Sequence, residues 1–181
     1  LLEKGAAIDS AKSDGWTSLH VASWDGYVDI VTLLLEKGAA IDSAKSDGWT
    51  SLHVASERGY VDIVTLLLEK GAAIDSATPD GWTPLHLASW DGSVDIVTLL
   101  LEKGAAIDSA KSDGWTSLHV ASEKGYVDIV TLLLEKGAGI DSATPDGMTP
   151  LHLASENGYV DIVTLLLEKG AGIDSATPDG R

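Results

Sequence analysis

The sequence lacks cysteine and phenylalanine altogether, and it contains one methionine among its 181 residues. Without cysteine, the chain can form no disulfide, no cysteine-ligated zinc site and no thiol nucleophile. This composition fits a reducing compartment, so we expect an intracellular, cytoplasmic protein. Long apolar runs are also missing. The run Leu33–Leu35 and its copies hold three residues each, whereas a membrane-spanning helix needs about 20, so we expect no membrane span.

Basic residues are scarce. The chain has 12 Lys and Arg residues against 28 Asp and Glu residues, which gives a formal net charge of −16 at pH 7. Such an acidic chain repels the phosphates of nucleic acids and of anionic membranes, so neither is an expected partner. A basic protein or peptide, or a cation, would instead be attracted.

What the sequence does contain is a 33-residue repeat, which runs from Asp14 to Ser46 and then begins again at four further Asp-Gly pairs. The complete units, numbered 1 to 5, are residues 14–46, 47–79, 80–112, 113–145 and 146–178. Residues 1–13 match the second half of a preceding unit, and residues 179–181 match the start of a following one. A period of this length predicts one array over residues 1–181, in which each unit buries its apolar face against the next.

Each unit reads as two short helices separated by glycine turns. In unit 1, an Asp-Gly pair predicts a turn, and Thr17 is a suitable N-cap for a first helix over about residues 18–25. Gly26 predicts the end of that helix. The apolar run that follows predicts a second helix over about residues 28–36, sandwiched between neighbouring units. Helices this short are marginal alone in water, so stacking has to stabilise them.

The pattern D-G-x-T-P-L-H-x-A, followed by G-x-x-x-I-V-x-L-L-L-x-x-G-A, resembles the ankyrin repeat over the whole chain. Residues 83–86 and 149–152 match the T-P-L-H signature fully, whereas the other three units have Ser in place of Pro. The resemblance implies an all-α repeat solenoid of stacked helix-turn-helix units with β-turn or hairpin connections. It also implies a curved stack with a concave groove, and a binding role without catalysis. One departure lies in the loop after the second helix, where this chain has Asp42 and its equivalents and the family has Asn. This change puts the hydrogen bonding of the loops in question.

The histidines recur once per unit, at His20, His53, His86, His119 and His152. A shared metal site needs ligands that converge within a few ångströms, whereas equivalent positions of adjacent units lie about 10 Å apart. We therefore expect each histidine to bond the threonine three residues earlier, and we expect no metal site and no cofactor. Because every Ser and Asp also recurs as a structural ladder, no catalytic Ser-His-acid group is indicated and we expect no enzyme.

Two sets of positions are candidates for partner contacts. The position after the turn glycine holds Trp16, Trp49, Trp82, Trp115 and Met148. The end of the first helix varies between otherwise near-identical units and holds Trp24-Asp25, Glu57-Arg58, Trp90-Asp91, Glu123-Lys124 and Glu156-Asn157. In ankyrin-like proteins both sets face the concave groove, and aromatic anchors flanked by charge have the composition of binding hot spots. For the Trp16 set we favour packing over the neighbouring turn, whereas for Trp24 and Trp90 we expect exposure and contact with a partner.

We therefore expect a scaffold that binds a protein or peptide along the concave groove, and the net charge leaves a basic partner open. The alternative is a structural solenoid that stacks head to tail into filaments. Four acidic positions also recur in every unit, those of Asp14, Asp29, Glu36 and Asp42. We interpret these columns as a solvated surface in preference to a calcium site or a groove for basic peptides.

Overall fold

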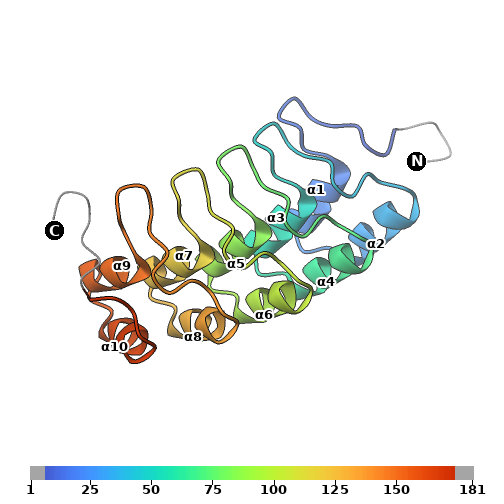
Figure 1. Cartoon of the computed structure of the whole chain (residues 1–181). Helices are drawn as coiled ribbons and strands as arrows, with labels where there is room; N and C mark the ends of the chain where they lie inside the picture. Colours follow the sequence, from blue (N-terminus) through green and yellow to red (C-terminus); the bar gives the residue numbers. More distant parts are fainter. Residues whose placement is uncertain (1–6, 174–181) are drawn as a thin grey trace.

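The computed structural model describes residues 7–173. Over these residues the chain forms ten helices and no strand, arranged as five pairs with one pair in each unit (Figure 1). The helices are α1 (Ser18–Trp24), α2 (Val28–Glu36), α3 (Ser51–Glu57), α4 (Val61–Glu69), α5 (Pro84–Asp91), α6 (Val94–Glu102), α7 (Ser117–Lys124), α8 (Val127–Glu135), α9 (Pro150–Glu156) and α10 (Val160–Glu168). The predicted all-α stack of helix pairs is confirmed.

Each first helix begins where the sequence predicts, because a threonine and a histidine cap it reciprocally. In α1, the Thr17 hydroxyl accepts the backbone N–H of His20, and His20 Nδ1 accepts the backbone N–H of Thr17. The helix ends at Trp24, one residue earlier than expected. The second helix has its predicted bounds, and Gly38 follows it with a left-handed φ of +86°.

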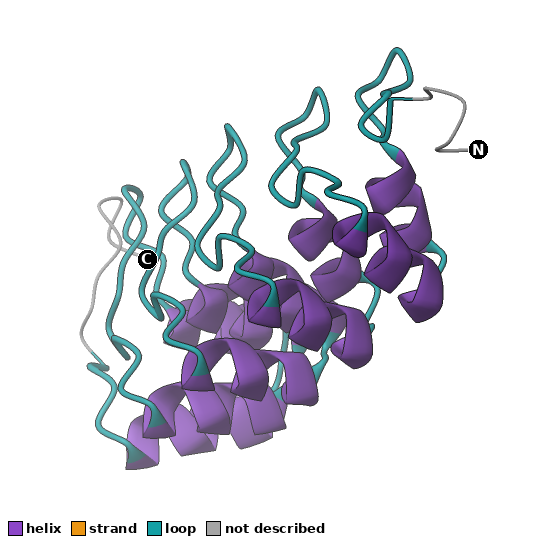
Figure 2. Cartoon of the chain, turned by 90° about the vertical axis from the view of Figure 1, so that its right-hand side faces the viewer, coloured by secondary structure: helices purple, strands orange, loops and turns teal. Residues whose placement is uncertain are grey.

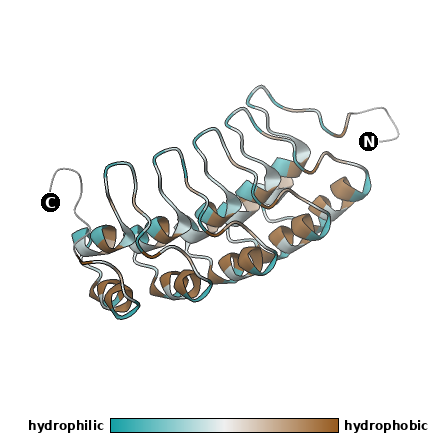
Figure 3. Cartoon of the chain, viewed as in Figure 1, coloured by the Kyte–Doolittle hydropathy of each residue, from teal (hydrophilic) through white to brown (hydrophobic). Residues whose placement is uncertain are grey.

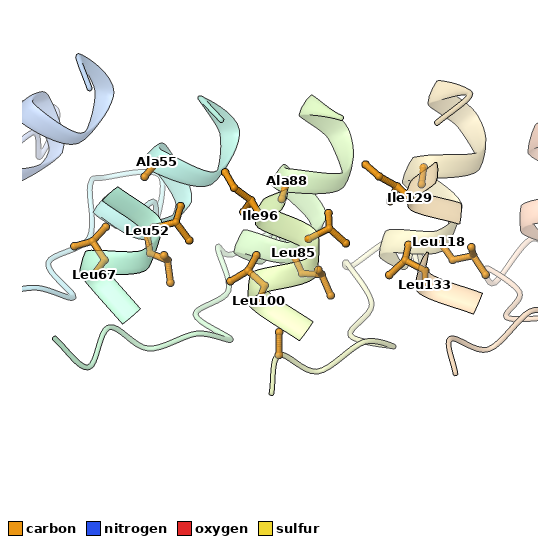
Figure 4. Packing of buried hydrophobic residues seen from close by; sticks show 14 of the residues in the cluster. Leu52, Ala55, Leu67, Leu85, Ala88, Ile96, Leu100, Leu118, Ile129 and Leu133 are labelled. Atoms are coloured by element: carbon orange, nitrogen blue, oxygen red, sulfur yellow. The ribbon is translucent and has the colours of Figure 1, made fainter. Parts of the chain in front are cut away.

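The helices form two layers that run the length of the stack (Figure 1). The first helices of the units pack side by side in one layer, and the second helices pack in the other. The interior between them is leucine, isoleucine, valine and alanine, and side chains such as Leu52, Leu85, Ile96 and Ile129 are at most 2% exposed (Figure 4). Because these side chains pack across the junctions between units, neighbouring units stabilise one another.

The second helices are mostly apolar, as their colouring in Figure 3 shows. On α4, α6 and α8 the isoleucine at the third position of the helix is fully buried: Ile63, Ile96 and Ile129 are each 0% exposed. The predicted sandwich is therefore confirmed for these helices. On α2 the equivalent Ile30 is 47% exposed, because no described unit covers that side of it.

Before each helix pair the chain extends into a loop, and these loops stand side by side away from the helical layers (Figure 2). We call them fingers 1 to 5, and their four-residue tips start at Lys12, Lys45, Thr78, Lys111 and Thr144. Each tip is a β-turn, closed in finger 2 by the N–H of Gly48 donating to the carbonyl of Lys45 at 2.9 Å. Just beyond the turn, the N–H of Lys45 donates to the carbonyl of Trp49 at 2.8 Å, as in a hairpin.

The loops that follow the second helices are hydrogen-bonded across the junctions. Asp42 Oδ1 accepts the backbone N–H of Ala73 in the next unit at 3.0 Å, and the same bond recurs from Asp9, Asp75, Asp108 and Asp141 at 2.9 Å. The aspartate that departs from the family pattern therefore supplies the acceptor that ties adjacent loops together.

Candidate binding surface

The histidines lie inside the stack and connect adjacent units. His53 Nδ1 accepts the N–H of Thr50 at 3.2 Å, and its Nε2 lies 3.0 Å from the carbonyl oxygen of Trp82 in the next unit. A carbonyl oxygen can only accept, so Nε2 carries the proton and the ring is neutral. The same bond to the next unit recurs at His20, His86 and His119. For His152 the corresponding partner, residue 181, lies outside the described residues.

The predicted bond to the threonine three residues earlier is confirmed at all five histidines, at 2.8 to 2.9 Å. Burial lowers the pKa of His20, His53 and His119, and it lowers the pKa of His86 to about 4; the bond to the carbonyl oxygen of the next unit opposes this only in part. These rings are therefore structural. Within residues 7–173, no three His, Asp or Glu side chains are placed to share a metal ion.

The Trp16 set lies half-buried beside these histidines. The rings of Trp16, Trp49, Trp82 and Trp115 lie 6.1 to 6.2 Å from the histidine of their own unit, measured between ring centroids. Met148 is also half-buried. The four tryptophan rings therefore contact the first helix of their own unit.

A group of aromatic and cationic side chains spans the junction of units 1 and 2. The rings of Trp16 and Trp24 meet edge to face, with centroids 5.7 Å apart. Arg58 lies over Trp24 at 4.5 Å, while Lys45 Nζ lies 4.5 Å from the ring of Trp16 and 5.1 Å from that of Trp49. Trp24 remains 37% exposed. Together with one acidic residue, these side chains form the first aromatic cluster, which consists of Trp16, Trp24, Lys45, Trp49, Glu57 and Arg58.

Units 3 and 4 repeat this arrangement. The rings of Trp82 and Trp90 meet edge to face at 5.8 Å, and Lys124 Nζ lies 3.2 Å from the ring of Trp90. Lys111 Nζ lies 4.3 Å from Trp82 and 5.2 Å from Trp115. Trp90 is 42% exposed. The second aromatic cluster consists of Trp82, Trp90, Lys111, Trp115, Glu123 and Lys124, and it differs in composition from the first only by Lys124 in place of Arg58.

Several carboxylates of this surface lack a cationic partner. Asp25 and Asp91, next to the exposed tryptophans, are exposed and form no ion pair with any described residue. Glu57 Oε2 and Glu123 Oε2 are shielded from water without a hydrogen bond, but Glu123 Oε2 forms an ion pair with Lys124 Nζ at 3.7 Å. Burial raises the pKa of Glu57, and the charge of Asp91 adds to this against the opposing effect of Arg58 and Lys45.

The lysines of the clusters are already engaged. Besides contacting two tryptophan rings each, Lys45 and Lys111 form ion pairs with Asp47 and Asp113 at 3.0 and 2.9 Å. Partial burial raises the pKa of Asp47, but the N–H of Trp49 and the Lys45 ammonium outweigh it, and the pKa lies below its usual range. Arg58 is exposed and forms no ion pair with a described residue. Together with its neighbouring aspartates, each cluster nevertheless holds three carboxylates against two cations, so the charge balance at this surface is acidic.

Unit 5 does not join a cluster. Its candidate residues are Met148, Glu156 and Asn157, and Asn157 donates through its side chain to the carbonyl of Leu153 at 2.8 Å. The structure thus brings the candidates of units 1 and 2 together, and those of units 3 and 4 together, and leaves those of unit 5 apart.

Comparison with protein families agrees with this architecture. A family model described as ankyrin repeats (3 copies) matches residues 40–111 and 104–177, and another, described as ankyrin repeats (many copies), matches residues 1–55. The chain belongs to the ankyrin repeat family. Ankyrin repeat proteins are generally non-catalytic scaffolds that bind protein partners. A search of the curated proteins finds no match to this ankyrin repeat chain. None of its described helices is long and apolar enough to cross a bilayer.

Sequence reasoning missed Lys45 and Lys111 as members of this surface. A signal for them exists, because Lys-Ser replaces Thr-Pro at the ends of units 1 and 3, the same units that carry Trp24 and Trp90. The contact of Arg58 with Trp24 joins residues one unit and one position apart, and only the stacked arrangement reveals it.

Proposed function

We propose that this ankyrin repeat chain is a non-catalytic, intracellular scaffold that holds a protein or peptide along the groove between its fingers and its first helices. The observation that carries the proposal is the pair of aromatic clusters, each with one partly exposed tryptophan beside an unpaired aspartate. A large aromatic side chain gains most from burial against a partner, and flanking charge selects which partner is accepted. Because the charge balance at both clusters is acidic and the chain carries a net charge of −16, the favoured partner is basic.

A peptide ligand selected from a random displayed library on the immobilised chain tests this proposal. The double variant Trp24→Ala/Trp90→Ala should bind the selected peptide at least about tenfold more weakly, with unchanged helicity by circular dichroism. Tyr27→Ala removes an aromatic side chain that is 54% exposed and belongs to neither cluster, so it should bind as tightly as the parent chain.

Hydrogen exchange with and without the peptide locates the contact. Protection is expected in the fingers and in α1, α3, α5 and α7. Unchanged affinity of the double variant, or protection confined to α4, α6 and α8, would contradict binding in the groove.

A second candidate is head-to-tail self-association, favoured by apolar side chains at both ends of the described stack. Ile30 and Leu33 on α2 are 47% and 51% exposed, and Leu167 on α10 is 40% exposed. Unit 1 covers Ile63 completely, and a near-identical unit of a second copy could cover Ile30 in the same way. Light scattering should then show a mass that grows with concentration and that Ile30→Glu reduces, whereas a constant monomer mass would argue against assembly.

A further inference from the structure

The two aromatic clusters are copies of one arrangement, set two units apart. Equivalent residues such as Trp24 and Trp90 are separated by 66 positions, which is twice the 33-residue repeat. The position that Trp24 occupies in unit 1 is occupied by Glu57 in unit 2, so the side chain there is aromatic in one unit and acidic in the next. Two units further along, the tryptophan recurs as Trp90, followed by Asp91 and covered by a cation, Lys124. The surface therefore has twice the period of the fold.

Each cluster leaves the same two groups open. The exposed part of Trp24 lies beside Asp25, and the exposed part of Trp90 lies beside Asp91. Neither aspartate forms an ion pair with a described residue, although Asp91 Oδ2 accepts the hydroxyl of Ser93. Lys45 and Lys111 are held between tryptophan rings and an aspartate. Arg58 and Lys124 already lie over the rings of Trp24 and Trp90, so these rings have the geometry for a stacked cation and a ligand would meet only their remaining exposed part. Arginine suits such a pair of groups, since its guanidinium stacks on aromatic rings and bonds carboxylates.

We propose that the two clusters are equivalent subsites for one extended basic segment, which places an arginine or lysine at each; this inference rests on the proposed function. Adjacent helices pack about 10 Å apart, so subsites two units apart are separated by about 20 Å. An extended chain advances about 3.3 Å per residue. The two basic residues of the partner are therefore about six positions apart, a spacing that the 33-residue repeat alone would not select.

Peptide rulers of fixed length test the spacing. Three fluorescein-labelled peptides carry two arginines separated by three, six or nine steps of a proline-rich spacer. Because a polyproline helix rises about 3.1 Å per residue, the arginines are held about 9, 19 or 28 Å apart at constant charge. Fluorescence anisotropy at low ionic strength should show the six-step peptide binding at least about tenfold more tightly than the other two, because only it engages both subsites at once.

Matched charge variants separate the subsites from general attraction to an acidic protein. The double variant Asp25→Asn/Asp91→Asn should bind the six-step peptide only as tightly as it binds the three-step peptide. Asp29→Asn/Asp95→Asn removes the same charge from the first turns of α2 and α6 and should keep the preference for six steps.

Equal affinity for the three rulers, or equal losses in the two double variants, would overturn the two-subsite inference and leave binding in the groove standing. A preference for three steps would show that the surface follows the 33-residue period, and would also overturn it. Failure of every ruler to bind would overturn the basic character of the ligand. The proposed function would then still be judged by the library-selected peptide and its footprint.

Discussion

Units 1 and 2 meet through a different set of side chains from units 2 and 3, although the helices are nearly the same. Between units 1 and 2, the N–H of Ser46 donates to the carbonyl of Asp14 at 3.1 Å and joins fingers 1 and 2. The ring of Tyr60 lies against Gly26 at the end of α1, where a Cβ would come within 3.0 Å of it. Lys45 bridges the tryptophans of both units.

The junction of units 2 and 3 lacks all three contacts. Pro79 replaces Ser46 and has no N–H to donate, and Ser93 stands in place of the tyrosine, facing Gly59. Two like charges, Glu57 and Asp91, also face each other across it. The histidine bond and the packing of α3 on α5 are retained, so the difference is confined to the fingers and the ends of the first helices.

This difference shows that near-identical repeats need not form equivalent junctions. Units 3 and 4 meet as units 1 and 2 do: Ser112 N–H donates to the carbonyl of Asp80 at 2.9 Å, and Tyr126 covers Gly92. Since the stability of a solenoid is approximately a sum over units and their interfaces, the stack should separate most easily between units 2 and 3.

Acid pH should produce the largest loss of stability, and it should weaken both junctions alike. Well above pH 6.5 the four buried histidines, His20, His53, His86 and His119, are neutral in the folded and the unfolded chain. Below it the unfolded chain takes up protons that the folded rings do not accept until the pH nears their lowered pKa, about 4 for His86. The free energy of unfolding should therefore fall between pH 6.5 and 4, by on the order of several kcal/mol for the four buried rings.

Urea denaturation across this pH range, with a histidine NMR titration, measures the effect. The four buried rings should titrate below the usual histidine range, and His86 should titrate near pH 4. A free energy of unfolding that stays level or rises as the pH falls from 6.5 would contradict the neutral histidine ladder.

Replacing Tyr60 by serine and Ser93 by tyrosine should reverse which of the two junctions is the more stable. Tyr60→Ser removes apolar area from the junction of units 1 and 2 and should lower the free energy of unfolding by about 1–2 kcal/mol. Ser93→Tyr supplies the missing ring over Gly59 and should raise it by about 1 kcal/mol. The control is Tyr27→Ser, which removes an exposed tyrosine and should change little. Equal losses for Tyr60→Ser and Tyr27→Ser in urea denaturation would sink this explanation.

Removing the bridging lysine should have a smaller effect. Lys45→Met keeps most of the aliphatic chain but removes the charge that faces two tryptophan rings and Asp47, so a loss of about 1 kcal/mol is expected. Lys37→Met, at an exposed position after α2, serves as the control for net charge. Equal stability of the two variants would show that Lys45 contributes no specific contact.

Added salt should change the stability least of these treatments, because each pair of like charges contributes little. Equivalent carboxylates of adjacent units repel by roughly 0.4 kcal/mol at about 10 Å in water, and salt screens this repulsion over about 8 Å. The melting temperature should rise from low to moderate NaCl concentration. A flat or falling melting temperature would mean that the ion pairs of Lys45 and Lys111 outweigh the acidic columns.

The helices were predictable because local signals set their ends. Thr17 and Gly38 mark a cap and a stop in the sequence, and the structure places them there. The role of the histidines as caps also followed from spacing. Their second bond, to the carbonyl of the next unit, did not, because it joins residues 29 positions apart and depends on how one unit lies on another.

The composition of the aromatic clusters was predictable only in part. The variable pair and the tryptophan column identified Trp24, Trp16 and Arg58 as candidates. That Arg58 covers Trp24 and that Lys45 lies between two rings depends on the rise and rotation between units, which the sequence does not state.

Native-state hydrogen exchange in mild denaturant tests the grouping of units most directly. The pairing of units 1 and 2, and of units 3 and 4, predicts that the amides of α1 to α4 exchange through one common opening. Those of α5 to α8 should exchange through another, with the step between α4 and α5. An opening free energy that rises smoothly from both ends of the stack, or a step between α2 and α3, would contradict it.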